Sequence, residues 1–337
     1  MSRRIAVVTR SGILTATGDE GEGWSTETTA TDQRPECVLI DDRRPDRLFV
    51  GTFEDGLWVS HDAGSTFESV GATRIEPDSV TAMAVDPTDG DHLLLGTEPS
   101  RLYQSDDGGE RWRQIVGLTD VPSADEWSFP PRPSTHHVRW IEIDPADPSR
   151  WYIGIEAGAL VYTPDAGETW HDRPPGSRRD NHTLATHPDA PGRVYSAAGD
   201  GYAESLDAGA SWETMHQGLD HRYVWGLAVD TGDPETVIVS AATGASNAHR
   251  TPGDAHLYRR GRDAGGWTHL EDCGVPTGAG ERRAVLSAGP AAGEFIAATD
   301  GGLYRSLDGG QQWDRLDIEF GSIGNSLPRG LAVTSPT

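Results

Sequence analysis

The sequence predicts an all-β protein in which seven four-stranded sheets form a ring, a seven-bladed β-propeller. Three observations predict it. A short motif returns along the 337 residues, alternating apolar runs surround each copy, and the two ends of the chain match complementary parts of one unit. Self-similarity at a period of about 40–50 residues is typical of repeat architectures. We therefore expect one domain over residues 1–337, in spite of a length that two domains could share.

The repeated motif is clearest in SLDGGQQW, Ser306–Trp313. Its other copies are Ser60–Phe67, Ser105–Trp112, Thr163–Trp170 and Ser205–Trp212, with weaker versions at Thr17–Trp24 and Gly261–Trp267. The central aspartates are Asp19, Asp62, Asp107, Asp165, Asp207, Asp263 and Asp308, spaced by 43, 45, 58, 42, 56 and 45 residues. Aspartate accepts hydrogen bonds from turn amides, glycine relieves the turn backbone, and the aromatic residue anchors the hairpin. The aspartates are therefore expected to be structural.

Each copy belongs to a set of four short alternating runs. In one unit these are Val80–Val85, Leu93–Thr97, Leu102–Ser105 and Arg113–Val116. Such runs, separated by Gly, Pro and Asp turns, predict an antiparallel four-stranded sheet. A lone sheet of this kind cannot bury both faces, whereas radial stacking covers each face with a neighbour.

The ends of the chain predict how the ring closes. Ile5–Thr9, Gly12–Thr17 and Trp24–Thr28 match the last three strands of a unit, and Gly330–Thr334 matches a first strand. We expect one blade built from residues 1–30 and 327–337, which would pair two otherwise free strand edges.

The motif resembles the Asp-box (BNR) repeat, which marks the turn between the third and fourth strands of a propeller blade. The resemblance covers nearly the whole chain and is nearest to uncharacterised prokaryotic, haloarchaeal proteins of the sialidase-like and sortilin-like superfamily. Asp-box propellers include sialidases, xyloglucan-degrading enzymes, sortilin-type receptors and a photosystem II assembly factor. The resemblance therefore implies the fold and leaves the function open.

The charge balance indicates the salt conditions and the compartment in which the protein works. The formal net charge is −25, and all 28 basic residues are arginine. An acidic, lysine-free surface is typical of a halophilic cytoplasm, where salt screens self-repulsion; a high-GC genome that favours arginine codons is the alternative. This charge opposes phosphate contacts with nucleic acid. No apolar run is long enough for a membrane span or a secretory signal. We expect a cytoplasmic monomer.

Two inserted segments predict where a ligand would bind. Leu118–His136 enlarges a connection between blades, and Thr243–His256 enlarges a loop between second and third strands. Both fall on the face opposite the Asp motifs, which is typical of a binding surface on a regular scaffold. The side chains that could grip a ligand there are Trp127, Phe129, Asn247, His249 and Arg250.

A column of the aligned first strands gives a sharper prediction. Around the ring it reads Glu36, Thr81, Arg139, His182, Trp225, Ala284 and Arg329, with His137, Asp180 and Arg282 close before it. Turns between second and third strands add Glu54, Asp55, Glu98, Glu156, Asp200 and Asp300. Large polar residues converging on one axis favour recognition; a water-filled mouth with mutually neutralising charges is the alternative. The expected ligand-binding residues are Glu36, His137, Arg139, Glu156, His182, Asp200, Trp225, His249, Arg250 and Arg329.

Three functions remain open at this point. The first is binding of a small anionic or sugar-like ligand, or of a protein segment, without catalysis. The second is a sialidase-like or other glycoside hydrolase, or a lyase, acting in the same mouth, although no catalytic residue can be chosen. The third is an assembly or scaffold factor. His136, His137, His182 and His221 lie close before first strands, but no short-range metal signature is present, so neither a metal nor a cofactor is expected.

Overall fold

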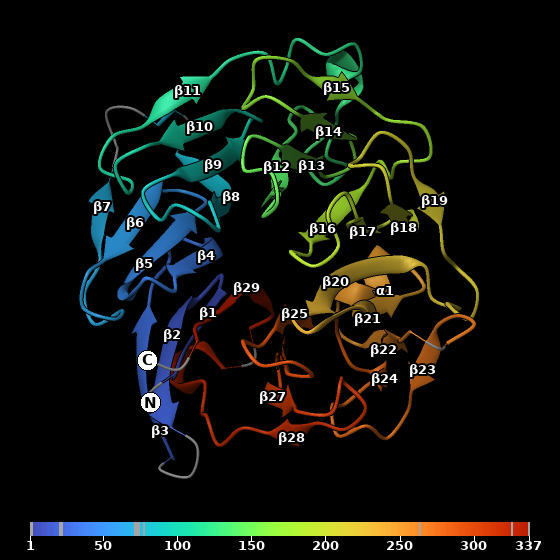
Figure 1. Ribbon diagram of the computed structural model, residues 1–337. Coiled ribbons are helices and arrows are strands. Elements are labelled where there is room, and N and C mark those ends of the chain that lie inside the picture. Colours follow the sequence, from blue (N-terminus) through green and yellow to red (C-terminus); the bar gives the residue numbers. More distant parts are fainter. Residues whose placement is uncertain are drawn as a thin grey trace.

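Seven antiparallel sheets stand around a central channel in the computed structural model (Figure 1). The structure describes residues 3–19, 23–70, 75–76, 78–262, 264–324 and 326–335. The predicted fold class is confirmed. The innermost, first strands are β29 Pro328–Val333, β4 Pro35–Asp41, β8 Ser79–Val85, β12 Val138–Ile143, β16 Asn181–Thr186, β20 Tyr223–Asp230 and β25 Val285–Ala288. Each first strand contacts the first strands of both neighbouring blades, which closes the wall of the channel.

The other strands follow outward in chain order. The second strands are β1 Arg3–Thr9, β5 Arg44–Thr52, β9 Leu93–Glu98, β13 Trp151–Ile155, β17 Val194–Ala198, β21 Asp233–Ala242 and β26 Phe295–Thr299. The third strands are β2 Gly12–Asp19, β6 Leu57–Ser60, β10 Leu102–Ser105, β14 Ala159–Thr163, β18 Gly201–Ser205, β22 Gly253–Arg260 and β27 Gly302–Ser306. The outer strands are β3 Gly23–Ala30, β7 Glu68–Val70, β11 Arg113–Ile115, β15 His171–Asp172, β19 Glu213–Thr214, β23 Thr268–Leu270 and β28 Asp314–Arg315.

Both ends of the chain build the closing blade, as predicted. Strand β29 pairs with β1 in the sheet order β29-β1-β2-β3, with Ile5 opposite Val333 and Val7 opposite Leu331. Figure 1 shows the two termini side by side at the edge of the ring. Segments more than 300 residues apart thus complete one sheet, so no unpaired first strand is left in it.

The Asp motifs form turns between third and fourth strands, where they act structurally. In the copy after β18, Ser205 Oγ donates to Asp207 Oδ1 (2.8 Å) and accepts from Gly209 N (2.8 Å). Asp207 Oδ1 also accepts from Ser211 N (2.8 Å), and the closing Trp212 is buried. The copies at Asp62, Asp107, Asp165 and Asp308 repeat this arrangement. Asp263 and the side chain of Asp19 lie outside the described residues.

The apolar core lies between the blades. Its largest cluster joins the β8–β11 and β12–β15 blades around the fully buried Trp151, and similar clusters fill the other interfaces. The blade that contains β20 carries two additions, the short helix α1 Ala245–His249 and the strand β24 Gly278–Gly280, which pairs with β22. Two 3₁₀ turns occupy Ala124–Glu126 and Gly321–Ile323. Within the described part of the chain, no helix has the length and apolarity needed to cross a bilayer.

Candidate ligand-binding site at the channel mouth

A ring of β-bulges builds the mouth of the channel. Near the start of six first strands the pairing register shifts across one residue, which is left without a partner on the second strand. These bulge residues are Glu36, Thr81, Arg139, His182, Trp225 and Arg329. A bulge breaks the alternation of side chains and re-aims the extra residue. The column predicted from the sequence is therefore a structural feature, since six of its seven members are bulges.

Trp225 lies at the centre of this ring beneath three arginines. The guanidinium carbon of Arg283 lies 4.2 Å from the centre of the indole ring, that of Arg139 4.7 Å, and that of Arg329 5.9 Å. His182 and His249 pack on the same indole with ring centres 4.4 Å away. Cations within about 6 Å of an indole face are attracted by its quadrupole. The indole therefore holds three positive charges together.

Two buried carboxylates neutralise part of this charge. Glu36 accepts from Arg329 Nε (2.7 Å) and from Arg10 Nε (3.1 Å). Burial raises the pKa of Glu36, but Arg329 and Arg10 outweigh burial and the net shift is downward. Glu156 accepts from His137 Nε2 (2.9 Å) and lies 3.7 Å from Arg139 Nε. Burial also raises the pKa of Glu156, but His137, His182 and Arg139 lower it further than burial raises it. Both carboxylates are therefore ionised.

Arg283 is the arginine whose charge is least compensated. Its side chain is 0% exposed, Nε donates to His249 Nδ1 (3.2 Å), and neither Nη atom has a hydrogen-bond partner among the described residues. Burial and the charges of Arg329 and Arg139 lower its pKa. His249 Nε2 is also hydrogen-bonded to the hydroxyl of Tyr223 (3.1 Å). These two hydrogen bonds of His249 hold α1 against the mouth. Since burial and the charges of Arg283 and Arg329 lower the pKa of His249 to about 2, its ring is neutral.

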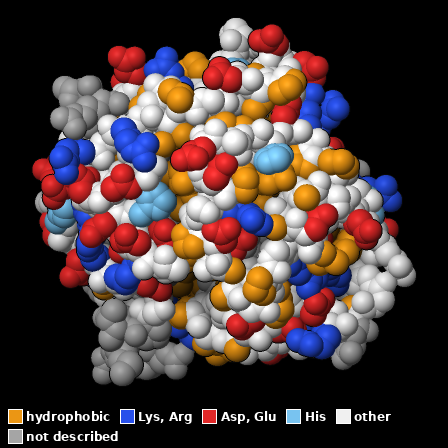
Figure 2. Space-filling model, turned by 45° about the horizontal axis from the view of Figure 1, so that its top comes forward, with side chains coloured by type: hydrophobic (Ala, Val, Ile, Leu, Met, Phe, Trp, Pro, Cys, Tyr) orange, Lys and Arg blue, Asp and Glu red, His pale blue; other side chains and the backbone are white. Residues whose placement is uncertain are grey.

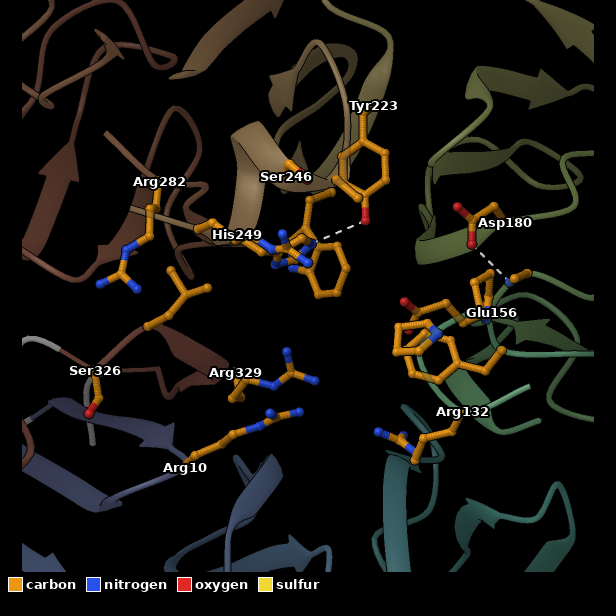
Figure 3. Close-up of a pocket in the computed structure, with 18 residues that line it drawn as sticks. Arg10, Arg132, Glu156, Asp180, Tyr223, Ser246, His249, Arg282, Ser326 and Arg329 are labelled. Carbon is orange, nitrogen blue, oxygen red and sulfur yellow. Dashed lines mark hydrogen bonds between the residues drawn. The ribbon is translucent and has the colours of Figure 1, made fainter. Parts of the chain in front are cut away.

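A cavity of about 790 Å³ opens above Trp225. Figure 3 shows Arg10, Arg282 and Arg329 on one side of the cavity, and Glu156, Asp180 and Arg132 on the other. Phe129, Pro130, Pro131 and Leu327 give the rim an apolar part. Beneath Trp225, Arg139 and Arg329 the channel continues as a small space of about 70 Å³. Two of the bulge residues, Trp225 and Arg329, therefore line a cavity of the size that small ligands occupy.

Both inserted segments reach this cavity, as expected from the sequence. Phe129 and Arg132 line it from the first segment, and Ala245, Ser246, His249 and Arg250 line it from the second. Arg132 is fixed by a paired hydrogen bond to Glu98 (2.7 and 2.6 Å). The expectation for Trp127 is wrong, because its indole is buried in the core and donates to Ser123 Oγ (2.8 Å). Asn247 does not line the cavity either.

The predicted site residues divide into three groups. Glu156, Trp225, His249, Arg250 and Arg329 line the cavity. Glu36, His137, Arg139 and His182 lie behind them and contact lining residues. Asp200 stands apart, because its carboxylate accepts from the backbone of Arg179 and Asp180 (3.3 and 3.4 Å) and so shapes a turn. The four histidines that precede first strands do not form one cluster. His136 packs on Trp127, and His221 stacks on His256.

Sequence reasoning missed three residues of the site. Arg10 occupies the turn between β1 and β2, the position at which other blades carry Glu156 or Asp200. Aligning the turn between β1 and β2 with the equivalent turns of the other blades would have identified Arg10. The other two are Arg283 and Tyr223, to which the sequence analysis gives no role. No local pattern distinguishes Arg283 from Arg282, because the full burial of Arg283 and the partial burial of Arg282 depend on how α1 packs.

Comparison with known proteins supports the fold and shows similarity to two groups of proteins. No family model matches the sequence. The chain is 23% identical over 301 residues to an oligoxyloglucan reducing end-specific xyloglucanase of Emericella nidulans, across 73% of this chain and 35% of that enzyme. It is 30% identical over 174 residues to the photosystem II stability/assembly factor HCF136 of Arabidopsis thaliana, across 51% of this chain and 36% of that protein. The chain spans about a third of the length of the curated relatives it matches.

Solved structures agree on the fold. An ancestral GH74 enzyme superposes with a TM-score of 0.63 at 14% identity, covering 89% of this chain and 38% of its own. YCF48 bound to D1 peptide gives a TM-score of 0.60 at 16% identity, covering 90% and 93%. The protein is a seven-bladed β-propeller similar to both groups. At this level of identity the likeness establishes the architecture alone.

Proposed function

We propose that this protein is a binding propeller that takes a small carboxylated ligand, or the carboxylate of a sugar acid or peptide, in the cavity above Trp225. Five of the ten sequence-predicted residues line this cavity, and Glu36, His137, Arg139 and His182 contact the lining residues from behind. Catalysis is not needed to explain the arrangement.

The observation that carries the proposal is the excess of positive charge at the mouth. The largely buried Arg139, Arg283 and Arg329 and the half-exposed Arg10 share two carboxylates, those of Glu36 and Glu156. The whole chain bears a net charge of −25, so this concentration of arginine runs against its composition. A buried cation without a partner costs stability unless a ligand completes it. The planar guanidinium matches a carboxylate through two parallel hydrogen bonds.

The kind of ligand follows from the walls of the cavity. Arginines on one side suit an anion, while Phe129, the prolines and Trp225 offer flat apolar surfaces of the sort on which sugar rings or peptide side chains pack. The xyloglucanases named above act on a glycan, and YCF48 was solved with a peptide. Either class would fit here if it presented a carboxylate.

Thermal shift in molar KCl tests the proposal. Glucuronate, sialic acid, citrate and a short peptide with a free C-terminus serve as probes, with neutral glucose and an amidated peptide as matched controls. At least one carboxylate should raise the melting temperature of the wild type, and the double variant Arg139→Gln, Arg329→Gln should lose that rise. The same variant must melt cooperatively without ligand. An equal rise in the double variant would place the ligand elsewhere.

Hydrolysis is a second candidate because two acidic side chains of the cavity differ in environment. The net shift lowers the pKa of Glu156, whereas burial raises the pKa of Asp180, and the negative charge of Glu156 raises it further while His182 opposes both. An ionised carboxylate beside a carboxyl group of raised pKa is the pairing that glycoside hydrolases use. Release of reducing sugar from oligoxyloglucans by the wild type, abolished in Glu156→Gln, would favour this candidate over simple binding.

A scaffold role has less support from the surface. The large apolar side chains most exposed in the described part of the chain are Val116, Leu206 and Leu307, which lie on three different blades. They form no common patch that would mark a protein interface. Figure 2 shows acidic side chains spread over the whole visible face. We further propose that the chain is an Asp-box protein and works as a monomer in a salt-rich cytoplasm. The acidic surface supports the last of these proposals.

A further inference from the structure

A second feature of the cavity is a cluster of three metal-type ligands in its acidic wall. Glu156 follows β13, Asp180 precedes β16, and His182 is the bulge residue of β16. One oxygen or nitrogen atom from each lies within 4.8 Å of the other two. Asp180 Oδ2 is 3.7 Å from His182 Nε2. The cluster therefore combines two carboxylates and one imidazole from two adjacent blades.

The hydrogen bond at the other nitrogen fixes the tautomer of a neutral His182 ring. Nδ1 lies 2.7 Å from the carbonyl oxygen of Val224 and must donate, since a carbonyl oxygen only accepts. In the neutral ring Nε2 then carries a lone pair. This hydrogen bond to a backbone carbonyl is the support that metal-binding histidines usually have.

Nε2 of His182 lies 3.7 Å from a carboxylate oxygen, too far for a direct hydrogen bond. Nε2 is fully buried and has no hydrogen-bond partner within the described ranges. Asp180 uses Oδ1 to accept from Ala157 N (2.8 Å), which leaves Oδ2 turned toward the imidazole. Glu156 makes its contacts with His137 and Arg139 through Oε2, which leaves Oε1 for a further partner. Acceptors that face one another are unfavourable unless a proton, a water molecule or a cation lies between them, and a cation can join all three side chains.

The spacing of the ligand atoms suits a metal ion. Nε2 has almost no surface that bulk water reaches. A metal ion bound at about 2.0–2.2 Å from nitrogen and oxygen fits between ligands that are about 3.3 Å apart, and the 3.7 Å pair needs only a small approach.

We infer that Glu156, Asp180 and His182 bind a divalent transition-metal ion such as Zn²⁺ or Mn²⁺ in the wall of the cavity. Mixed nitrogen and oxygen ligands suit these ions. Three protein ligands leave a coordination position open toward the cavity, where an oxygen of a ligand would bind while the arginines hold its carboxylate. The metal site departs from the sequence expectation that no metal binds, and it does not depend on the anion proposal.

Metal titration of the full chain tests the inference. Protein freed of metals with EDTA is titrated by calorimetry with ZnCl₂ or MnCl₂ in KCl, without any carboxylate, and free Mn²⁺ is followed by electron paramagnetic resonance. One ion should bind per chain. Asp180→Asn and Glu156→Gln should each weaken binding at least about tenfold. Glu54→Gln is the matched control, because Glu54 occupies the corresponding turn of another blade and is half-exposed.

Asp180→Asn also gives a readout that loss of folding cannot imitate. Asn keeps an oxygen for Ala157 N and places an amide donor opposite His182 Nε2. The metal-free variant should therefore melt at the same or a higher temperature than the metal-free wild type, while Zn²⁺ stabilises the wild type alone. The inference fails if the wild type binds no stoichiometric ion, if a proton alone satisfies His182, or if both carboxamide variants bind metal as tightly as the control.

Discussion

Arg283 stacks on Trp225 with 4.2 Å between guanidinium carbon and ring centre, and its two Nη atoms find no hydrogen-bond partner in the described part of the chain. Arg139 approaches the same indole, so two like charges contact one aromatic ring. Such an arrangement is costly in an empty site, since a buried guanidinium without an acceptor loses its hydration. This loss of folding stability indicates that Arg283 is present to bind a ligand.

Replacing Arg283 by Met should separate stability from binding. The uncharged side chain fills similar volume, so the ligand-free protein should melt at the same or a higher temperature. Stabilisation by the best carboxylate probe should disappear. Arg262→Met, which removes a mostly exposed arginine that does not line the cavity, is the control and should retain the stabilisation. A strongly destabilised Arg283→Met protein would show that the buried charge is already paired.

Glu142 should make stability depend on pH. Burial raises the pKa of its carboxyl to about 7, although hydrogen bonds from Thr186 and Trp140 oppose the rise. Because the folded pKa lies above the unfolded value of about 4.3, the protonated form favours folding. That contribution is complete below the unfolded pKa and is lost as the pH rises through about 7.

Glu142→Gln should therefore remove part of the loss of stability between about pH 5 and about pH 8. Urea midpoints of the wild type and the variant at both pH values measure it. Glu213→Gln, on the exposed strand β19, corrects for the change in net charge. Parallel pH profiles for the wild type and Glu142→Gln would contradict the raised pKa.

Ser205→Ala tests the structural role of the Asp motif. Ser205 Oγ is the acceptor for the buried Gly209 N, and leaving that amide unsatisfied should cost about 1–3 kcal/mol of unfolding free energy. Carboxylate binding should not change, because the turn lies at the far end of β18 from the mouth. Leu206→Ala alters a 70% exposed neighbour and should leave stability unchanged. Loss of binding without loss of stability in Ser205→Ala would give the motif a functional role.

Stability should also rise with salt. At a net charge of −25 the folded chain repels itself, and screening by KCl weakens that repulsion. Melting temperatures should increase from low to molar KCl. A melting temperature that stays constant or falls over this range would favour codon usage as the reason for the lysine-free composition.

The sequence predicted the ring because its signals are local. Each Asp motif ties its own turn, as Ser205 and Asp207 do, and alternation marks each strand. The column through Arg139, Trp225 and Arg329 was also predicted, since repeats align equivalent positions. The bulges that aim these residues could not be read from alternation. The inward burial of Trp127 and the burial of Arg283 depend on how the inserted segments pack, and neither segment repeats elsewhere in the chain.

A crystal structure of the protein with the carboxylate that stabilises it most tests the central claim directly. The account predicts that the carboxylate lies over Trp225, within hydrogen-bonding distance of at least two of Arg139, Arg283 and Arg329. A ligand bound on another face, or a cavity that stays empty at saturating ligand, would contradict it.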